Sequence, residues 1–175
     1  TGSDVFSYCS SLNTIEISDN VNTISAALFN GINEQVYNEY RDCYYLGNEN
    51  NKFLVLIKPK NTDIVSVKMP EQTKIIVENA FQNCESLTSV TIGNGVTCIG
   101  TGVFDGCTSL NYSEYNNGYY LGNNSNPIVV FIKAKNTDII SYDINEKTKC
   151  IYDYAFKDCT SLTSITIPDS VTSIS

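Results

Sequence analysis

Apolar and polar residues alternate in short runs that recur along this chain. The run LTSITI at residues 162–167 places Ile165 and Ile167 between polar residues. Alternation with a period of two over so few residues is typical of a β-strand that buries one face. A proline then turns the chain, and Val171 and Ile174 form a second apolar pair. The pattern therefore predicts a strand, a turn and a second short strand.

The same sequence pattern occurs three times at a fixed interval. Residues 5–25, 80–100 and 155–175 read VFSYCSSLNTIEISDNVNTIS, AFQNCESLTSVTIGNGVTCIG and AFKDCTSLTSITIPDSVTSIS, so each copy begins 75 positions after the one before. Within each period the leading position of the strand recurs at spacings of 23, 29 and 23, at Leu12, Gln35, Ile64, Leu87, Leu110, Ile139 and Leu162. A fixed period without gaps indicates a repeat architecture of about seven coils.

Such coils form a solenoid, because one coil has too few apolar residues to make a core and must stack on its neighbours. We expect one elongated domain over residues 1–175, divided into super-repeats 1–75, 76–150 and a partial 151–175. Both ends interrupt a repeat, which predicts a segment of a longer protein or end-to-end self-association. The strands of a parallel sheet are expected near Asn13–Ile17, Val36–Tyr40, Val65–Met69, Thr88–Ile92, Asn111–Tyr115, Ile140–Ile144 and Thr163–Ile167. The expected core phenylalanines are Phe6, Phe29, Phe81, Phe104 and Phe156.

Small residues precede most of the strands by three positions. This column contains Cys9, Ile32, Asn61, Cys84, Cys107, Asn136 and Cys159. Free cysteine is among the most buried residue types, so we interpret the column as a structural ladder of protonated, inert thiols at a coil corner. A disulfide between Cys84 and Cys107 or a metal site is the less favoured reading.

The two longer coils carry an additional pair of apolar runs. Asparagine-rich turns at residues 48–51 and 123–126 separate YYLG from KFLVLI and from PIVVFI. This arrangement favours a β-hairpin that replaces the Ala-Phe side of the coil, the alternative being an enlarged coil without pairing. Four lysines, Lys58, Lys60, Lys133 and Lys135, follow these runs. They would attract an anion, or simply solvate an edge and discourage strand addition.

Most of the 12 tyrosines also lie in the longer coils. Tyrosine suits interfaces because its ring is apolar and its hydroxyl is polar, although it is also a good strand residue. The strand frame places Tyr37 with Glu39, and Tyr112 with Glu114, on the exposed face, whereas a shift by one residue would exchange Tyr37 for Asn38. The candidate binding residues are Tyr37, Glu39, Tyr45, Tyr112, Glu114 and Tyr120.

Composition excludes several classes of function. The net charge of −8 makes nucleic-acid binding unfavourable, and the absence of histidine removes the usual nucleophile arrangements and most zinc sites. We therefore expect no catalytic residues, metal or cofactor. No run of 18 apolar residues predicts a membrane span. The first residues lack the charged and apolar regions of a secretion signal, which leaves open a cytosolic chain or one whose leader has been removed.

The stretch AFKDCTSLTSITIPDSVTSI resembles the BspA-like leucine-rich repeat, also called the Treponema pallidum-type repeat, and the resemblance extends over essentially the whole chain. It implies a mostly β, right-handed solenoid with a parallel sheet on one side. It also implies a bacterial cell-surface or secreted protein with a role in adhesion or in binding host proteins. We expect its ligand to be an extracellular protein or glycan.

Three functions remain open at this point. The first is a non-catalytic binding or adhesion module, for which a solenoid offers an extended face. The second is a structural spacer in a surface protein. The third, an enzyme of the carboxylate glycosidase type, is weakened because no acidic pair breaks the repeat.

Overall fold

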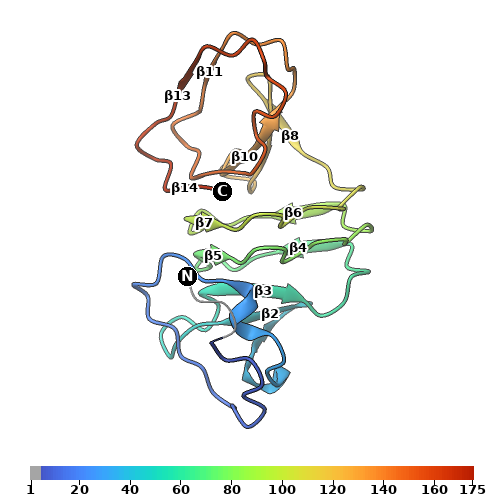
Figure 1. Cartoon of the computed structure of the whole chain (residues 1–175), viewed down its shortest axis with the longest axis vertical. Coiled ribbons are helices and arrows are strands. Elements are labelled where there is room, and N and C mark those ends of the chain that lie inside the picture. The colour runs from blue at the N-terminus through green and yellow to red at the C-terminus, as the bar shows by residue number, and fades with distance from the viewer. Residues whose placement is uncertain (1–4) are drawn as a thin grey trace.

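A computed structural model describes residues 5–175, which form short strands and two 3-10 helices (Figure 1). The helices are η1 (Ala26–Phe29) and η2 (Glu34–Val36). No helix within this part of the chain is long and apolar enough to cross a membrane. The strands fall into four sheets, two of five strands and two of two strands.

The two-stranded sheets are parallel ladders between consecutive short coils. Strand β4 (Ser66–Lys68) pairs with β6 (Ser89–Thr91), and β11 (Ser141–Asp143) pairs with β13 (Ser164–Thr166). Each residue pairs with the one 23 positions later, as in Val67 with Val90. The predicted parallel strands near 65–69, 88–92, 140–144 and 163–167 are thus confirmed.

The second apolar pair of each short coil also forms parallel ladders, at the end of the coil opposite to the two-stranded sheets. Strand β5 (Ile75–Ile76) pairs with β7 (Cys98–Ile99), and β12 (Cys150–Ile151) pairs with β14 (Ser173–Ile174). In Figure 1, β5 and β7 lie beside β4 and β6 in the middle of the molecule, at the other end of the same coils. These coils are therefore flat, with one short ladder at each end.

The long segments form three-stranded antiparallel meanders. The first meander consists of β1 (Asn38–Tyr40), β2 (Cys43–Leu46) and β3 (Val55–Pro59), and the second of β8 (Ser113–Tyr115), β9 (Gly118–Leu121) and β10 (Val130–Ala134). The predicted hairpin is confirmed as the pairs β2 with β3 and β9 with β10. Sequence analysis missed the other hairpin of each meander, in which β1 pairs with β2 and β8 with β9.

These meanders correct the predicted parallel sheet. Two of its expected strands, at 36–40 and 111–115, contribute β1 and β8 to antiparallel pairs instead. The expected strand Asn13–Ile17 is reduced to one bridge between Glu16 and Gly47. The seven predicted coils thus become about five regular turns and two meanders. The parallel sheet is interrupted at each meander, because β1 and β8 pair with β2 and β9 and not with a strand of a neighbouring coil.

The two halves of the molecule meet at β7 and β14, which occupy equivalent places in successive super-repeats (Figure 1). The Thr172 hydroxyl donates to the Thr97 carbonyl at 2.8 Å, and the Ser175 hydroxyl donates to the Ile99 carbonyl at 2.6 Å. Hydroxyl side chains thus bridge two strands that do not form a regular ladder with each other.

In the shorter coils, the residue just before each column residue has a left-handed backbone conformation and forms a corner. The column residues concerned are Cys9, Ile32, Cys84, Cys107 and Cys159. The corner residues Tyr8, Gly31, Asn83, Gly106 and Asp158 all have φ between 61° and 77°. At the four corners followed by a cysteine, the cysteine amide donates to a phenylalanine carbonyl, as in Cys84 N to Phe81 O at 3.0 Å. Glycine and asparagine or aspartate tolerate this conformation best, which explains why they predominate at the corner.

Phenylalanine fills the centre of the stack. Phe29, Phe81 and Phe104 are buried as predicted, and the rings of Phe81 and Phe104 stack with centroids 6.0 Å apart. Phe6 and Phe156 are only half-buried, which corrects the prediction for these two. Both lie in the outermost described coils, which have a neighbouring coil on one side. In the last of these, Ile165, Ile167 and Ile174 are also 41 %, 46 % and 62 % exposed.

Replacing a stacked phenylalanine should destabilise the fold far more than replacing an outer one. Phe81→Ala leaves a cavity between two coils and is expected to lower the free energy of unfolding by about 3–5 kcal/mol. Phe156→Ala, the matched control, should cost less because water already reaches its ring. Chemical denaturation of both variants measures the difference, and a larger loss for Phe156→Ala would contradict this stacking order.

The cysteines of the described chain are free thiols in different surroundings. Cys84 and Cys107 are buried and unpaired, whereas Cys9 is exposed and Cys159 is half-buried, so the inert column is confirmed only in its middle. Outside the column, burial raises the pKa of the Cys43 and Cys150 thiols to about 12. Their reactive thiolate forms are therefore scarce at neutral pH.

Alkylation at pH 8 should separate these cysteines. Cys9 is expected to react with iodoacetamide within minutes, whereas Cys43 and Cys150 should react only when denaturant unfolds the chain. Peptide mass spectrometry after short labelling provides the measurement. Equal labelling of Cys43 and Cys9 in the native protein would show that the first meander does not cover the Cys43 thiol.

Candidate binding surface

One face of the first meander carries a cluster of tyrosines and charged residues. Register places Glu39 of β1 opposite Tyr44 of β2, and Tyr44 opposite Lys58 of β3, so these side chains share a face. The rings of Tyr37 and Tyr44 lie 5.4 Å apart between centroids. We call this cluster the first patch, comprising Glu34, Tyr37, Glu39, Tyr44, Lys58 and Lys60.

Charges in the first patch are paired. Lys58 Nζ lies 2.6 Å from Glu34 Oε1, and Lys60 Nζ lies 2.5 Å from Glu39 Oε2. The hydrogen bond from Lys58 and its positive charge lower the pKa of Glu34. Lys58 Nζ also lies 5.6 Å from the centre of the Tyr44 ring, within the range of a cation–π contact. Both lysines of the first patch are therefore already paired with a carboxylate.

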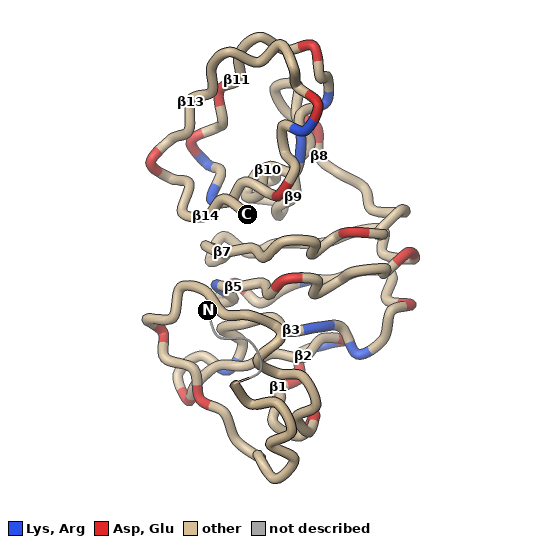
Figure 2. Tube along the Cα trace, viewed as in Figure 1, with Lys and Arg blue, Asp and Glu red and all other residues tan. Residues whose placement is uncertain are grey.

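The second meander repeats this arrangement one super-repeat later. Glu114 faces Tyr119 across β8 and β9, and Lys135 Nζ lies 2.5 Å from Glu114 Oε2. The rings of Tyr112 and Tyr119 lie 6.0 Å apart. We call this cluster the second patch, comprising Tyr112, Glu114, Tyr119, Lys133 and Lys135. Figure 2 shows basic residues on both meanders and acidic residues spread along the chain.

Four of the six candidate residues lie in these patches. Glu39 and Glu114 are exposed, while Tyr37 and Tyr112 are half-buried. Burial raises the pKa of Tyr37 to about 12, with a smaller contribution from the Glu34 charge. Glu39 lies opposite Tyr44, and the Tyr37 ring packs beside that of Tyr44, so Tyr37 and Glu39 lie on the same face of the meander.

Tyr45 and Tyr120 are not available to a partner, which corrects their selection as contact residues. Both are fully buried under the meanders, where Tyr45 packs edge-on against Phe53 at 5.5 Å and Tyr120 contacts Phe131 at 5.0 Å. The adjacent Tyr44 and Tyr119 lie in the patches instead and were missed. The adjacent pair of tyrosines could have indicated this, because neighbouring residues of a strand point to opposite faces of the sheet.

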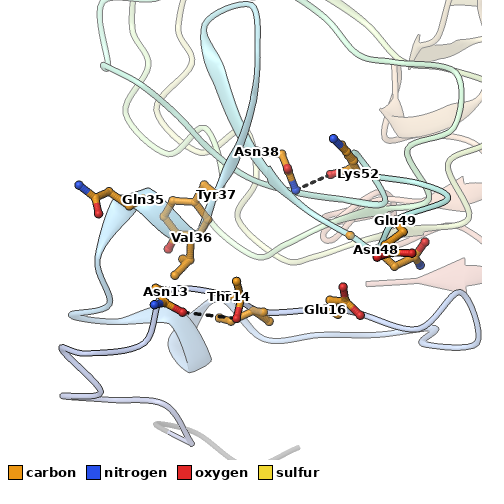
Figure 3. Close-up of a pocket in the computed structure, with 12 residues that line it drawn as sticks. Asn13, Thr14, Glu16, Gln35, Val36, Tyr37, Asn38, Asn48, Glu49 and Lys52 are labelled. Atoms are coloured by element: carbon orange, nitrogen blue, oxygen red, sulfur yellow. Dashed lines mark hydrogen bonds between the residues drawn. The ribbon is translucent and has the colours of Figure 1, made fainter.

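A groove runs between each meander and the preceding coil. The first groove has a volume of about 270 Å³ and is lined by Thr14 and Glu16 on one side and by Tyr37, Asn38 and Asn48 on the other (Figure 3). The second groove, of about 330 Å³, is lined by the equivalent residues of the next super-repeat, among them Ser89, Thr91, Tyr112, Ser113 and Asn123. Each of the tyrosines Tyr37 and Tyr112 thus borders both a groove and a patch.

Asparagine side chains hold the meanders against their neighbours. Asn48 accepts hydrogen bonds from the amides of Asn50 and Asn51 and donates to the Ile17 carbonyl at 2.8 Å. Asn123 makes the equivalent contacts, donating to the Ile92 carbonyl at 2.8 Å. Because these turns are tied to the preceding coil, patch and groove keep a fixed relative position.

No cluster of three or more cysteine, aspartate or glutamate side chains within residues 5–175 could hold a metal ion. Partly exposed tyrosines, paired charges and shallow polar grooves are suited to non-covalent contact with a partner surface. Their repetition gives two equivalent surfaces on one chain.

Comparison with known proteins gives a family and three similar structures. The model of the BspA type leucine rich repeat region matches six copies over residues 1–48, 60–126 and 130–175. A leucine rich cell surface protein from Faecalibacterium prausnitzii A2-165 is 20% identical, covering 79% of this chain and 44% of its own, with a TM-score of 0.40. A leucine-rich repeat protein from Bacteroides ovatus ATCC 8483 is 26% identical, covering 77% and 33%, with a TM-score of 0.41.

A third structure, of a leucine-rich repeat protein from Eubacterium ventriosum ATCC 27560, is 16% identical and covers 82% of this chain and 50% of its own, with a TM-score of 0.31. The chain therefore spans half or less of the length of each of these proteins. A search of curated proteins found no match. Since the family model covers most of the sequence, the chain belongs to the family of the BspA type leucine rich repeat region.

Proposed function

We propose that this chain is a non-catalytic binding module of a bacterial surface protein and that its two meanders contact an extracellular protein or glycan. The observation that supports this most directly is the recurrence of the same patch and the same groove in successive super-repeats. Core packing requires Tyr45 and Tyr120, but it does not require the exposed charges of each patch.

The chemistry of the patches fits such a role. Tyrosine provides a large contact area at a small loss of conformational entropy, and lysine and glutamate add orientation. A partner with repeated features that engages both patches would gain avidity. Membership of the BspA type repeat family favours a location on the bacterial cell surface, where such a partner would be met.

Two alternatives are less well supported. A spacer would need neither patch, so the repeated surface charges of the two meanders would be without a role. A glycosidase needs a general acid whose pKa is raised, whereas the pKa values of Glu34 and Glu78 are lowered. Burial alone would raise the pKa of Glu78, but hydrogen bonds from the Ser25 hydroxyl and the Ala26 amide lower it overall.

Binding should depend on the outward-facing tyrosine of each patch. We expect an array of extracellular proteins and glycans to yield a ligand for the 175-residue chain. Tyr44→Ala or Tyr119→Ala should then weaken it about tenfold, as for aromatic residues at the centre of an interface. For a partner that engages both patches, the double variant should lose more affinity than either single variant. Biolayer interferometry provides the measurement.

Tyr154→Ala is the matched control. Tyr154 is 73% exposed and lies beside a lysine, Lys157, at 5.5 Å, but belongs to neither meander. Its replacement should leave affinity unchanged. If no ligand is found at high protein concentration, the spacer role is favoured, and if Tyr154→Ala weakens binding as much as Tyr44→Ala, the meanders are not the contact surface.

A further inference from the structure

The two patches differ in one electrostatic respect. Lys58 of the first patch is paired with Glu34, but the equivalent of Glu34 in the next super-repeat is Ser109, which is neutral. Within residues 5–175 no carboxylate lies within 4.0 Å of Lys133 Nζ. Lys133 is exposed and lies 5.8 Å from the centre of the Tyr119 ring. The first patch is thus balanced in charge, whereas the second has an unpaired cation.

The grooves differ in the same direction. Glu16 and Glu49 of the first groove correspond to Thr91 and Asn124 in the second, and Lys52 corresponds to Pro127. The lining of the second groove therefore carries no charged side chain, while that of the first carries two carboxylates and one lysine, a net charge of −1. On a chain of net charge −8, both changes make the second meander the more favourable one for an anion.

We propose that the second patch and its groove bind the uronate residues of an acidic polysaccharide, and that the first patch does not. This inference rests on the proposed binding role and identifies the ligand for one of the two surfaces. Tyr112 lines the groove, its ring lies next to that of Tyr119, and the Tyr119 ring lies next to Lys133. A bound oligosaccharide therefore extends from the groove across both rings to the lysine.

Each part of this surface matches a part of a uronate. The negative face of the tyrosine rings attracts the C–H groups of a sugar ring, which carry a partial positive charge. The side chains of Ser113 and Asn124, both exposed, can exchange hydrogen bonds with sugar hydroxyls. Lys133 then pairs with the carboxylate. An acidic peptide fits less well, because the groove offers polar side chains rather than an apolar pocket for a peptide side chain.

The test uses trigalacturonate as the probe and its methyl ester as the neutral control, measured by isothermal titration calorimetry on the 175-residue chain. We expect one site for trigalacturonate, weakened at high salt, and at least fivefold weaker binding of the ester. Lys133→Gln should lower the affinity for trigalacturonate at least fivefold, and Lys58→Gln, the matched control, should not change it.

Exchanging the distinguishing residue between the two copies provides a second test. Ser109→Glu supplies the carboxylate that Lys133 lacks and should weaken binding, because it competes with the ligand for the lysine. Glu34→Ser frees Lys58 and should raise the stoichiometry toward two sites. Both positions are exposed, so neither change should alter the thermal unfolding temperature.

Three results would overturn the inference while leaving the proposed binding function intact. They are equal affinity for the methyl ester, equal loss from Lys58→Gln and Lys133→Gln, and tighter binding of a hexaglutamate peptide than of trigalacturonate. Absence of any trigalacturonate binding would also overturn it. The proposed function itself fails if the protein and glycan array yields no ligand that depends on Tyr44 or Tyr119, or if Tyr154→Ala weakens binding as much as Tyr44→Ala.

Discussion

A single coil of this chain cannot bury its own apolar side chains, and the rest of the structure depends on that constraint. Each short coil carries one strand pair and one ring, so Phe81 gains a complete surrounding only when the next coil places Phe104 against it at 6.0 Å. Parallel ladders at both ends of the coil hold this stacking in register, with every residue paired to its equivalent in the next coil. A repeated coil therefore serves as the hydrophobic partner of its neighbour.

This constraint made much of the fold predictable from the sequence. The alternation around Val67 and Val90 indicated strands, and the constant spacing indicated which strands pair. The meanders were predicted only in part, because an antiparallel first hairpin depends on a tight turn. At Asn116 and Asn117 that turn has two left-handed residues, whereas the equivalent Arg41 and Asp42 carry no glycine or asparagine that would signal it. Once β2 covers the edge of β3, the preceding coil loses its place in the ladder.

The candidate surface was predicted less completely than the fold. Sequence spacing identified Tyr37, Glu39, Tyr112 and Glu114, since they recur at the same position of the strand. It could not separate Tyr44 from Tyr45, because two adjacent tyrosines look alike until a sheet assigns one to each face. The sequence indicated two equivalent basic spots. It did not show that Lys58 is paired and Lys133 is not, because that difference depends on a contact between Lys58 and Glu34, which lie 24 positions apart.

The asparagine turns also bear on how a protein built from such super-repeats can change in length. Asn48 binds the Ile17 carbonyl, Asn123 binds the Ile92 carbonyl, and both reach back by 31 residues. Each of these contacts lies within one super-repeat, 1–75 or 76–150, so every complete copy carries its own. In-frame recombination between copies can therefore lengthen or shorten a protein of this design by whole units, each of which adds or removes one meander. The two meanders of this chain differ in this way at the equivalent positions Glu34 and Ser109.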